Sequence, residues 1–320
     1  MTKPSAEGPN RPQVKHIEVT QKNELQRVDN FLLGILKGVP KSKIYRVIRK
    51  GEVRINKKRC KPETKLVLGD VVRVPPIYSD ESAQKKVFVS DSLAQQLKQA
   101  ILFENQEVLA LNKPAGIAVH GGSGVQLGLI EALRTIYPDT QFLELVHRLD
   151  RDTSGCILVA KSRPSLRSLH RQFREDEINK YYHLAVFGKW AKHRRKVDAP
   201  LRRSELQSGE RMVCVAQDGK PSQTMFRILN GTRNFSLLEA KPITGRTHQI
   251  RVHAAFSGCP IVGDKKYIKD NVEEFHGMEK CRLMLHARKL QFALREGQRV
   301  EIEAEYDAAF SKALSEMSLL

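Results

Sequence analysis

Residues 147–155 read HRLDRDTSG, and the apolar run CILVA follows at once at residues 156–160. A short run of branched and small apolar residues is typical of a buried strand. Asp150 therefore lies in a short loop at a loop–strand junction, with Arg148 and Arg151 on either side. A carboxylate at such a junction is held rigidly, and nearby guanidinium groups favour its charged form. A nucleophilic or charge-stabilising aspartate is prepared in this way, so Asp150 is the first candidate catalytic residue.

Two other interpretations of this loop are open. Asp150 or Asp152 can cap the following turn or pair with Arg148, as loop aspartates often do. The two carboxylates also suggest the acid–base machinery of a glycosidase. Residues i and i+2 of an extended loop project to the same side, however, so this pair is poorly placed to flank one bond from its two opposite faces.

The composition favours a polyanionic partner. The 320 residues suffice for a catalytic domain and a small module. Lysine and arginine number 55 against 36 acids, which gives a net charge of +19 and a pI near 9.8. Nucleic acid is the first candidate partner and an anionic membrane surface the second, while a merely soluble basic protein is the bland alternative. No apolar run approaches the roughly 18–20 residues of a membrane span.

The cysteines and the N-terminal residues predict a cytoplasmic protein. The five cysteines are widely spaced and form no Cys-x-x-Cys motif, which argues against a disulfide framework or a thiolate zinc site. Residues 1–24 are predicted to be a disordered leader, and residues 1–12 lack the apolar stretch of a signal peptide.

Residues 25–76 are predicted to form a small basic module. Apolar residues recur at helical spacing at positions 28, 31, 32, 35 and 36, which indicates one buried helix face. A second helix would turn Ile44, Val47 and Ile48 inward and end at Gly51. Its outer face would carry Lys43, Arg46, Arg49 and Lys50. Two strand-like pieces, at 53–55 and 71–74, complete the module.

The basic residues of this module form a candidate RNA-binding surface. Ten lysines and arginines lie between residues 41 and 61, and Glu52 is the one acid among them. A charge run is often only a solvated face. Here the basic side chains project from one helix and the adjoining turn, so they can follow a phosphate backbone. The order of elements resembles the RNA-binding module first recognised in small-subunit ribosomal protein four.

The rest of the chain predicts an α+β domain over residues 100–320, after a polar linker at 77–99. Strand-like runs lie at 108–111, 157–160, 183–187, 224–229, 235–240 and 283–290, and helical candidates at 128–136, 165–173 and 247–256. Strands and helices do not alternate strictly, so a doubly wound parallel sheet is not indicated. We expect a mixed, largely antiparallel sheet.

Several ordered segments of this domain resemble the motifs of the RluA-type pseudouridine synthases, enzymes that isomerise uridine in RNA. The segments are NKPAG at 112–116, HRLDRDTSG at 147–155, KYYHLAVFG at 180–188, TGRTHQIRVH at 244–253 and MLHA at 284–287. Leu184 departs from the pattern, since alanine is common at that place in the family. The resemblance covers about residues 100–295.

The resemblance implies a catalytic domain of the pseudouridine synthase type that needs no cofactor. Asp150 would be the catalytic carboxylate, and Tyr182 would stack on the uracil and reach a ring proton. Arg251 would fix Asp150 through a bidentate pair. Further substrate contacts are expected from Arg148, Leu285 and His120.

Plainer interpretations of these residues remain. Tyr182 can simply pack into the sheet, as tyrosines on strands do. Thr247 can cap the helix that follows it. His248, His253 and His286 suggest a metal site, but an i, i+5 spacing puts the first two on different helix faces, and we expect no metal.

The resemblance implies an enzyme that converts uridines of 23S rRNA, free or in a large-subunit assembly intermediate, to pseudouridine. We expect a monomer without a small-molecule cofactor or a membrane partner. A non-catalytic rRNA-binding or ribosome-assembly protein is the alternative, because the basic patch alone would allow it. A hydrolytic nucleosidase or glycosidase would need a second carboxylate and would release a free base or sugar.

Overall fold

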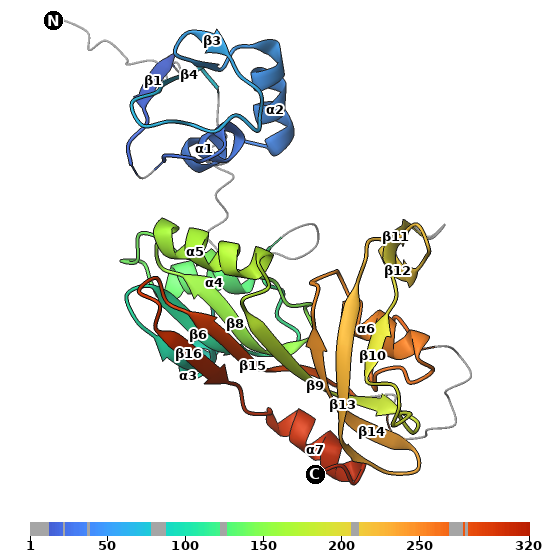
Figure 1. Cartoon of the computed structure of the whole chain (residues 1–320). Helices are drawn as coiled ribbons and strands as arrows, with labels where there is room; N and C mark the ends of the chain where they lie inside the picture. Colours follow the sequence, from blue (N-terminus) through green and yellow to red (C-terminus); the bar gives the residue numbers. More distant parts are fainter. Residues whose placement is uncertain are drawn as a thin grey trace, which may run out of the picture. The chain divides into compact units, whose positions relative to one another are not determined.

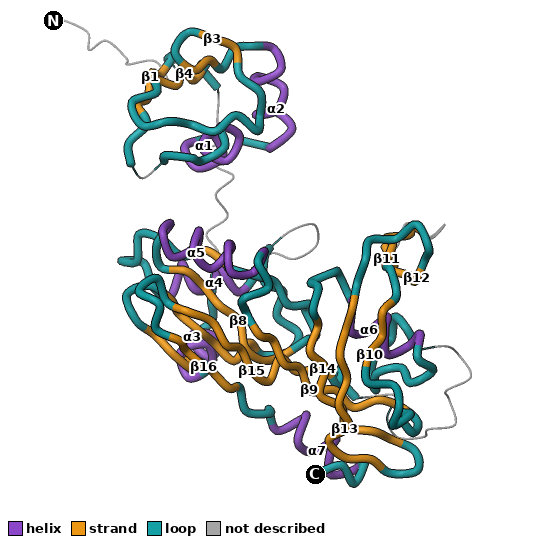
Figure 2. The backbone as a smooth tube through the Cα atoms, in the orientation of Figure 1, coloured by secondary structure: helices purple, strands orange, loops and turns teal. Residues whose placement is uncertain are grey.

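The computed structural model describes residues 13–21, 23–36, 39–77, 88–121, 127–205, 211–268, 278 and 281–320. They belong to two compact units, Met1–Lys86 and Val87–Leu320. Figures 1 and 2 show the elements of each unit. No helix within these described ranges is long and apolar enough to cross a membrane.

The N-terminal unit is a four-stranded antiparallel sheet with two helices. Its strands follow the order β1-β4-β2-β3. Their bounds are β1 Lys15–Glu18, β2 Arg54–Ile55, β3 Lys58–Arg59 and β4 Val71–Val74, and the helices are α1 Val28–Ile35 and α2 Lys41–Lys50. Ile44, Val47 and Ile48 are buried, as their helical spacing predicts. Gly51 ends α2 with a φ of 73°, a left-handed conformation that glycine adopts without strain.

Two expectations for this unit are wrong. The leader was expected to reach residue 24, but Lys15–Glu18 forms β1 and pairs with β4. Its sequence, KHIE, has a single apolar residue, so no strand period was visible. Ile35 was expected on the buried helix face, yet it is exposed, because it lies in the last turn of α1.

The larger unit is built on one ten-stranded mixed sheet. Its main path is β10-β13-β14-β9-β15-β8-β6-β5, and β16 and β7 pair with β15 and β8. The strands are β5 Ile101–Glu104, β6 Val108–Lys113, β7 Glu144–Leu145, β8 Ser154–Ala160, β9 Asn179–Phe187, β10 Lys196–Asp198, β13 Gln223–Gly231, β14 Phe235–Pro242, β15 Leu285–Ala293 and β16 Arg299–Glu303. Among these described strands, β8 and β15 run parallel and the other pairs are antiparallel. The predicted α+β class is confirmed.

Helices and one hairpin complete the larger unit. They are α3 Asp91–Gln99, α4 Leu129–Ile136, α5 Arg163–Arg174, α6 Gln249–Phe256 and α7 Ala308–Glu316, with the hairpin β11 Leu201–Glu205 and β12 Arg211–Val215. The linker was expected to extend to residue 99, and α3 contradicts its last part. Ser90 caps α3 by accepting a hydrogen bond from the Leu93 amide, and Leu97 is buried in the core.

Strand β15 joins two hydrophobic cores of this sheet. One core surrounds β6 and β8 together with α4 and α5. The other surrounds β9 and β14 together with α6 and α7. Leu285 of β15 packs into the second core, whereas Leu290 and Phe292 of the same strand pack into the first. The loop before β8 therefore lies where the two halves of the sheet meet.

Candidate active site

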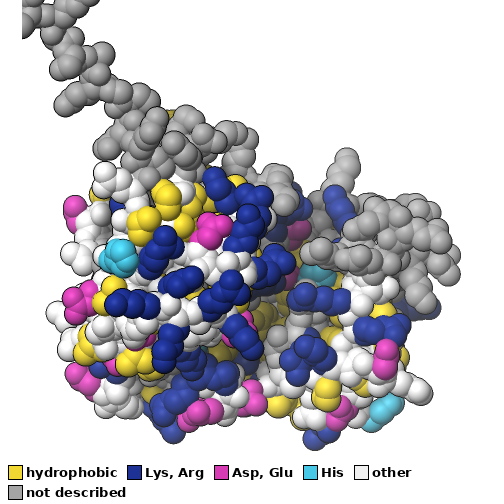
Figure 3. All heavy atoms as spheres, turned by 90° about the horizontal axis from the view of Figure 1, so that it is seen from above, with side chains coloured by type: hydrophobic (Ala, Val, Ile, Leu, Met, Phe, Trp, Pro, Cys, Tyr) yellow, Lys and Arg dark blue, Asp and Glu magenta, His cyan; other side chains and the backbone are white. Residues whose placement is uncertain are grey.

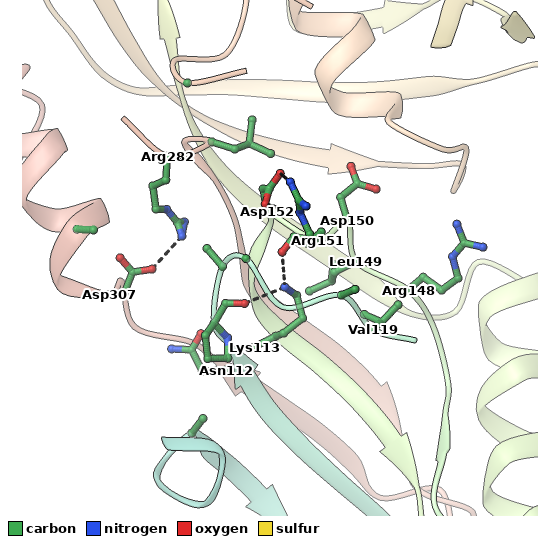
Figure 4. Close-up of a pocket in the computed structure, with 18 of the residues that line it drawn as sticks. Asn112, Lys113, Val119, Arg148, Leu149, Asp150, Arg151, Asp152, Arg282 and Asp307 are labelled. Atoms are coloured by element: carbon green, nitrogen blue, oxygen red, sulfur yellow. Dashed lines mark hydrogen bonds and ion pairs between the residues drawn. The ribbon is translucent and has the colours of Figure 1, made fainter. Parts of the chain in front are cut away.

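A buried lysine holds the loop that carries Asp150. Lys113, at the end of β6, is fully buried, and its ammonium donates to the carbonyl oxygens of Pro114, Ile117 and Arg151 at 2.8–2.9 Å (Figure 4). Burial lowers the pKa of Lys113 to about 7. Three carbonyl dipoles satisfy all three donors of the ammonium group. The lysine thereby ties the loop after β6 to the loop that carries Asp150, while the Asp150 carboxylate points away from it in Figure 4.

Gly155 brings this loop against β15. Its φ is 107°, and a Cβ atom there would lie 2.3 Å from the carbonyl oxygen of Ala287. Only glycine combines this backbone conformation with so close an approach. Strand β8 can therefore pair with β15 immediately after the Asp150 loop, where His286 lies opposite Ser154.

The charge facing Asp150 comes from α6. The Nη1 atom of Arg251 donates to Asp150 Oδ2 at 3.2 Å. The flanking arginines were expected to stabilise this carboxylate, and this expectation is wrong. Arg151 turns to Asp152, at 3.0 Å, and Arg148 is exposed. Arg151 is adjacent to Asp150, and adjacent side chains of an extended segment diverge, whereas α6 approaches the carboxylate from across the fold.

Arg251 gives its bidentate fork to a different acid. Its Nε and Nη2 atoms donate to the two oxygens of Asp264 at 2.8 and 2.7 Å, which leaves Nη1 for Asp150. The predicted bidentate pair between Arg251 and Asp150 is thus wrong. Burial opposes the charge of Arg251, but the hydrogen bonds that it donates to Asp264, together with the negative charges of Asp264 and Asp150, outweigh this effect and raise the pKa of Arg251. The guanidinium is fixed on Asp264 and presents one N–H to the carboxylate of Asp150.

His248 provides a second polar contact to Asp150. It precedes α6 with a φ of 53°, and its Nε2 atom lies 3.7 Å from Asp150 Oδ2. Its Nδ1 atom lies 2.7 Å from Tyr267 Oη, which itself accepts a hydrogen bond from the Val213 amide. Burial lowers the pKa of His248, so the ring is neutral near pH 7. With Tyr267 donating to Nδ1, the Nε2–H faces the carboxylate.

Thr247 does not cap α6, contrary to expectation. Its hydroxyl accepts a hydrogen bond from Arg203 at 3.0 Å, and no side chain of the N-cap residue His248 caps the helix. Gln249, the first residue of α6, instead holds the preceding turn, because its Oε1 atom accepts from the Arg246 amide at 3.0 Å and from the Thr244 hydroxyl at 2.7 Å.

Asp150 lies between two cavities. The smaller, of about 420 Å³, is lined by Tyr182, Leu285 and Arg251 among others, and it can enclose one base. The larger, of about 1430 Å³, is a basic cleft. Its cationic lining consists of Lys113, Arg148, Arg151, Arg251, Lys265, Lys266 and Arg282, with His120 and His248. Arg148 and Asp150 line both cavities.

Burial raises the pKa of Tyr182, and the charge of Asp150 adds to this effect. The phenol therefore stays protonated near neutral pH. A neutral aromatic ring beside a carboxylate is suited to stack on a flat, uncharged base.

Comparison with known proteins identifies the family of this chain. Residues 107–256 match the family described as RNA pseudouridylate synthase, and residues 26–72 match the S4 domain. The chain is 50% identical, over 303 residues, to ribosomal large subunit pseudouridine synthase C of Pasteurella multocida (strain Pm70), which covers 94% of this chain and 93% of that protein. The chain belongs to the RNA pseudouridylate synthase family.

Two further relatives support the assignment to the RNA pseudouridylate synthase family. The enzyme of the same name from Escherichia coli (strain K12) is 48% identical over 312 residues, 96% of this chain and 97% of that protein. The solved structure of human RNA Pseudouridylate Synthase Domain Containing 4 has a TM-score of 0.59 and 25% identity, and it covers 71% of this chain and 96% of that chain. The predicted family, its fold and the N-terminal RNA-binding module are confirmed.

The structure of this pseudouridylate synthase family member brings most predicted site residues together. Asp150, Tyr182, Arg251 and Leu285 surround the smaller cavity, and His120 lines the larger one. Lys43, Arg46, Arg49 and Lys50 lie on α2 of the other unit. In the part of the chain that is described, no three His, Cys, Asp or Glu residues group as metal ligands would. Lysine and arginine side chains crowd the face shown in Figure 3.

Sequence reasoning missed Asp264, Tyr267 and the role of Lys113. Asp264 follows the short apolar run 261–262 and Gly263, an apolar-to-turn boundary like the one beside Asp150. This boundary was the available signal for a second buried carboxylate at the site.

Proposed function

We propose that this protein converts specific uridines of 23S rRNA to pseudouridine. The names of its relatives refer to the ribosomal large subunit, and their similarity spans nearly the whole chain. The observation that carries the proposal is the Asp150 carboxylate, held by Arg251 at the wall of a base-sized cavity that contains the ring of Tyr182.

The reaction moves the uracil from N1 to C5 attachment on the same ribose. The target uridine is flipped out of its helix into the smaller cavity, where Tyr182 stacks on the base and Leu285 packs beside it. Asp150 assists cleavage of the C1′–N1 bond, by attack on C1′ or by stabilising the change at the sugar. Arg251 keeps the carboxylate oriented throughout. The enclosed cavity retains the detached base while it turns, and it excludes water that would divert the reaction to hydrolysis.

Tyr182 acts first as a stacking surface. Because its phenol is protonated, it takes up the C5 proton only by passing its own proton to a water at the same time. A water relay at this position also returns a proton to N1, and the net reaction leaves the mass of the RNA unchanged.

The basic surfaces position the RNA. Arg148 and His120 line the larger cleft, where backbone phosphates beside the flipped nucleotide would pass. Lys43, Arg46 and Arg49, with Lys50, would bind structured rRNA through its backbone and shape. We further propose that the protein acts as a cytoplasmic monomer, on free rRNA or on an assembly intermediate, without a cofactor.

The decisive experiment is incubation with unmodified 23S rRNA, followed by carbodiimide–alkali mapping of pseudouridines. Discrete new stops should appear with the wild type and vanish with Asp150→Asn, while RNA binding survives. Asp152→Asn separates the isomerase from a two-carboxylate hydrolase, because only the hydrolase needs both acids. Absence of stops on 23S, 16S and transfer RNA, with RNA still bound, would favour the non-catalytic rRNA-binding or assembly protein.

A further inference from the structure

A second buried lysine lies in the wall of the smaller cavity. Lys180, near the start of β9, is 8% exposed and lines this cavity together with Tyr182. Residues i and i+2 of a strand project from the same face, so the lysine and the active-site tyrosine lie side by side on β9. Phe173 covers the ammonium, which lies 5.4 Å from the ring centroid.

The ammonium of Lys180 makes no hydrogen bond or ion pair with the described parts of the chain. The contrast with Lys113 is informative, since that side chain is fully buried and its ammonium donates to three carbonyl oxygens. The stem of Lys180 is buried, while its Nζ atom keeps access to the open space of the cavity. Burial lowers the pKa of Lys180, the charge of Asp176 raises it and that of Lys241 lowers it. Three donors are therefore available to whatever enters the cavity.

The position favours a base over a phosphate as the acceptor. A uridine that is flipped out of an RNA helix enters a closed pocket base first, and its phosphates stay at the rim. Lys180 is more than nine-tenths buried, whereas Arg148, which also lines the cavity, is exposed. The exposed arginine is the better placed of the two for the RNA backbone.

We propose that Lys180 is a catalytic residue that donates a hydrogen bond to a carbonyl oxygen of the flipped uracil and stabilises the base when it leaves the sugar. This inference rests on the proposed isomerisation. When the C1′–N1 bond breaks, its electron pair stays with the base, and the resulting negative charge spreads to O2 and O4. C5 then bonds to C1′ and gives up its proton, and N1 takes one from solvent. The hydrogen bond from a fixed ammonium to a carbonyl oxygen is strongest when that negative charge is present, so it lowers the barrier to bond cleavage.

The test measures tritium release from 23S rRNA labelled at uridine C5, with enzyme in saturating excess. C5 loses its hydrogen at each isomerisation, and saturating enzyme keeps all of the RNA bound, so the release rate measures turnover of the bound complex. Lys180→Met should lower this rate on the order of 100-fold or more, as loss of one charge-stabilising donor does. RNA affinity and its salt dependence should stay unchanged, and Lys180→Arg should recover part of the rate.

Lys241→Met is the matched control. Lys241 is the neighbouring cation whose charge acts on Lys180, but it stacks on Tyr181 and does not line the smaller cavity. Its loss removes the same charge and should leave the rate unchanged. Turnover of RNA that contains 4-thiouridine at the target, measured in the wild type and in Lys180→Met, identifies the acceptor. Sulfur accepts hydrogen bonds weakly, so a rate loss in the wild type that is absent in Lys180→Met assigns the contact to O4, and an equal loss in both excludes O4.

Three results would overturn the inference. One is an unchanged rate for Lys180→Met. Another is a normal rate at saturation with weaker binding and a smaller salt slope, which marks a phosphate contact. The third is a large drop in melting temperature in both Lys180→Met and Lys180→Gln. Their slow turnover would then result from unfolding. Absence of tritium release by the wild type would refute the proposed function itself.

Discussion

Replacement of Asp264 by asparagine should disable the site without touching Asp150 directly. Asparagine keeps one acceptor oxygen, so one of the two hydrogen bonds to Arg251 is lost together with the negative charge. A hydrogen bond to a charged group contributes about 1.5–3 kcal/mol. Loss of one partner of a buried ion pair costs about 3–5 kcal/mol. Asp150 still neutralises part of the charge of Arg251, so we expect about 3 kcal/mol of lost stability, at the lower end of that range.

The effect on turnover follows from geometry. Without its anchor, the guanidinium recentres on Asp150, the remaining acid, and draws that carboxylate out of position. A misplacement of about 1 Å costs on the order of 100-fold in rate. Tritium release at saturating enzyme measures the rate, filter binding measures RNA affinity and urea denaturation measures stability. We expect a slower rate with unchanged affinity, because no RNA contact is removed.

Asp218→Asn is a control with a similar pair. Arg202 donates to both oxygens of Asp218, at 2.9 and 2.7 Å, but both side chains are exposed. This substitution should change neither stability nor rate measurably, since exposed pairs contribute little. If Asp264→Asn behaved like Asp218→Asn, the argument that Asp264 positions Arg251 would be refuted.

Three further predictions concern other parts of the chain. Gly155→Ala should destabilise the fold by about 3 kcal/mol or more in urea denaturation, because its Cβ would meet the Ala287 backbone; a soluble, active variant would contradict this. His286 is buried with its pKa lowered to about 4, so the unfolded chain takes up its proton first as the pH falls. Between pH 6.5 and 4, the free energy of unfolding of the wild type should fall more steeply than that of His286→Gln, and the slopes should differ by about 1.4 kcal/mol per pH unit. Equal slopes would refute the lowered pKa of His286. Neutralising Arg46, Arg49 and Lys50 with glutamine should reduce the salt slope of rRNA binding by about three, with the mapped sites unchanged; an unaltered slope would exclude α2 as a phosphate contact.

The sequence predicts those strands whose local pattern agrees with their place in the fold. Strand β8 has seven consecutive buried residues, and its core reads as a branched apolar run. Strands such as β7, with two residues, and β10, KVD, depend on their neighbours for pairing and have no period of their own. Helix α3 was missed for a similar reason, because one buried leucine among polar residues gives no helical stripe.

The candidate site shows the same division. The motifs predict that Asp150, Tyr182 and Arg251 meet, and they line one cavity. They do not predict how Arg251 divides its donors, because Asp264 approaches from a turn thirteen residues later and takes the fork. Lys113 was visible as a motif letter, but its role needs three carbonyl groups that only the folded loops bring together.

Strand β15 has a consequence for biosynthesis. It is the last strand of the main path to be translated, yet it lies between β8 and β9 in the middle. A nascent chain folds from its N-terminal side, and pairing between distant segments is slow. The half with Asp150 and the half with Tyr182 can each collapse early, but β15 must insert between them before the cavity is complete. We therefore expect the growing polypeptide to stay inactive until residues 285–293 have left the exit tunnel, so that it spares the rRNA of the ribosome that is translating it.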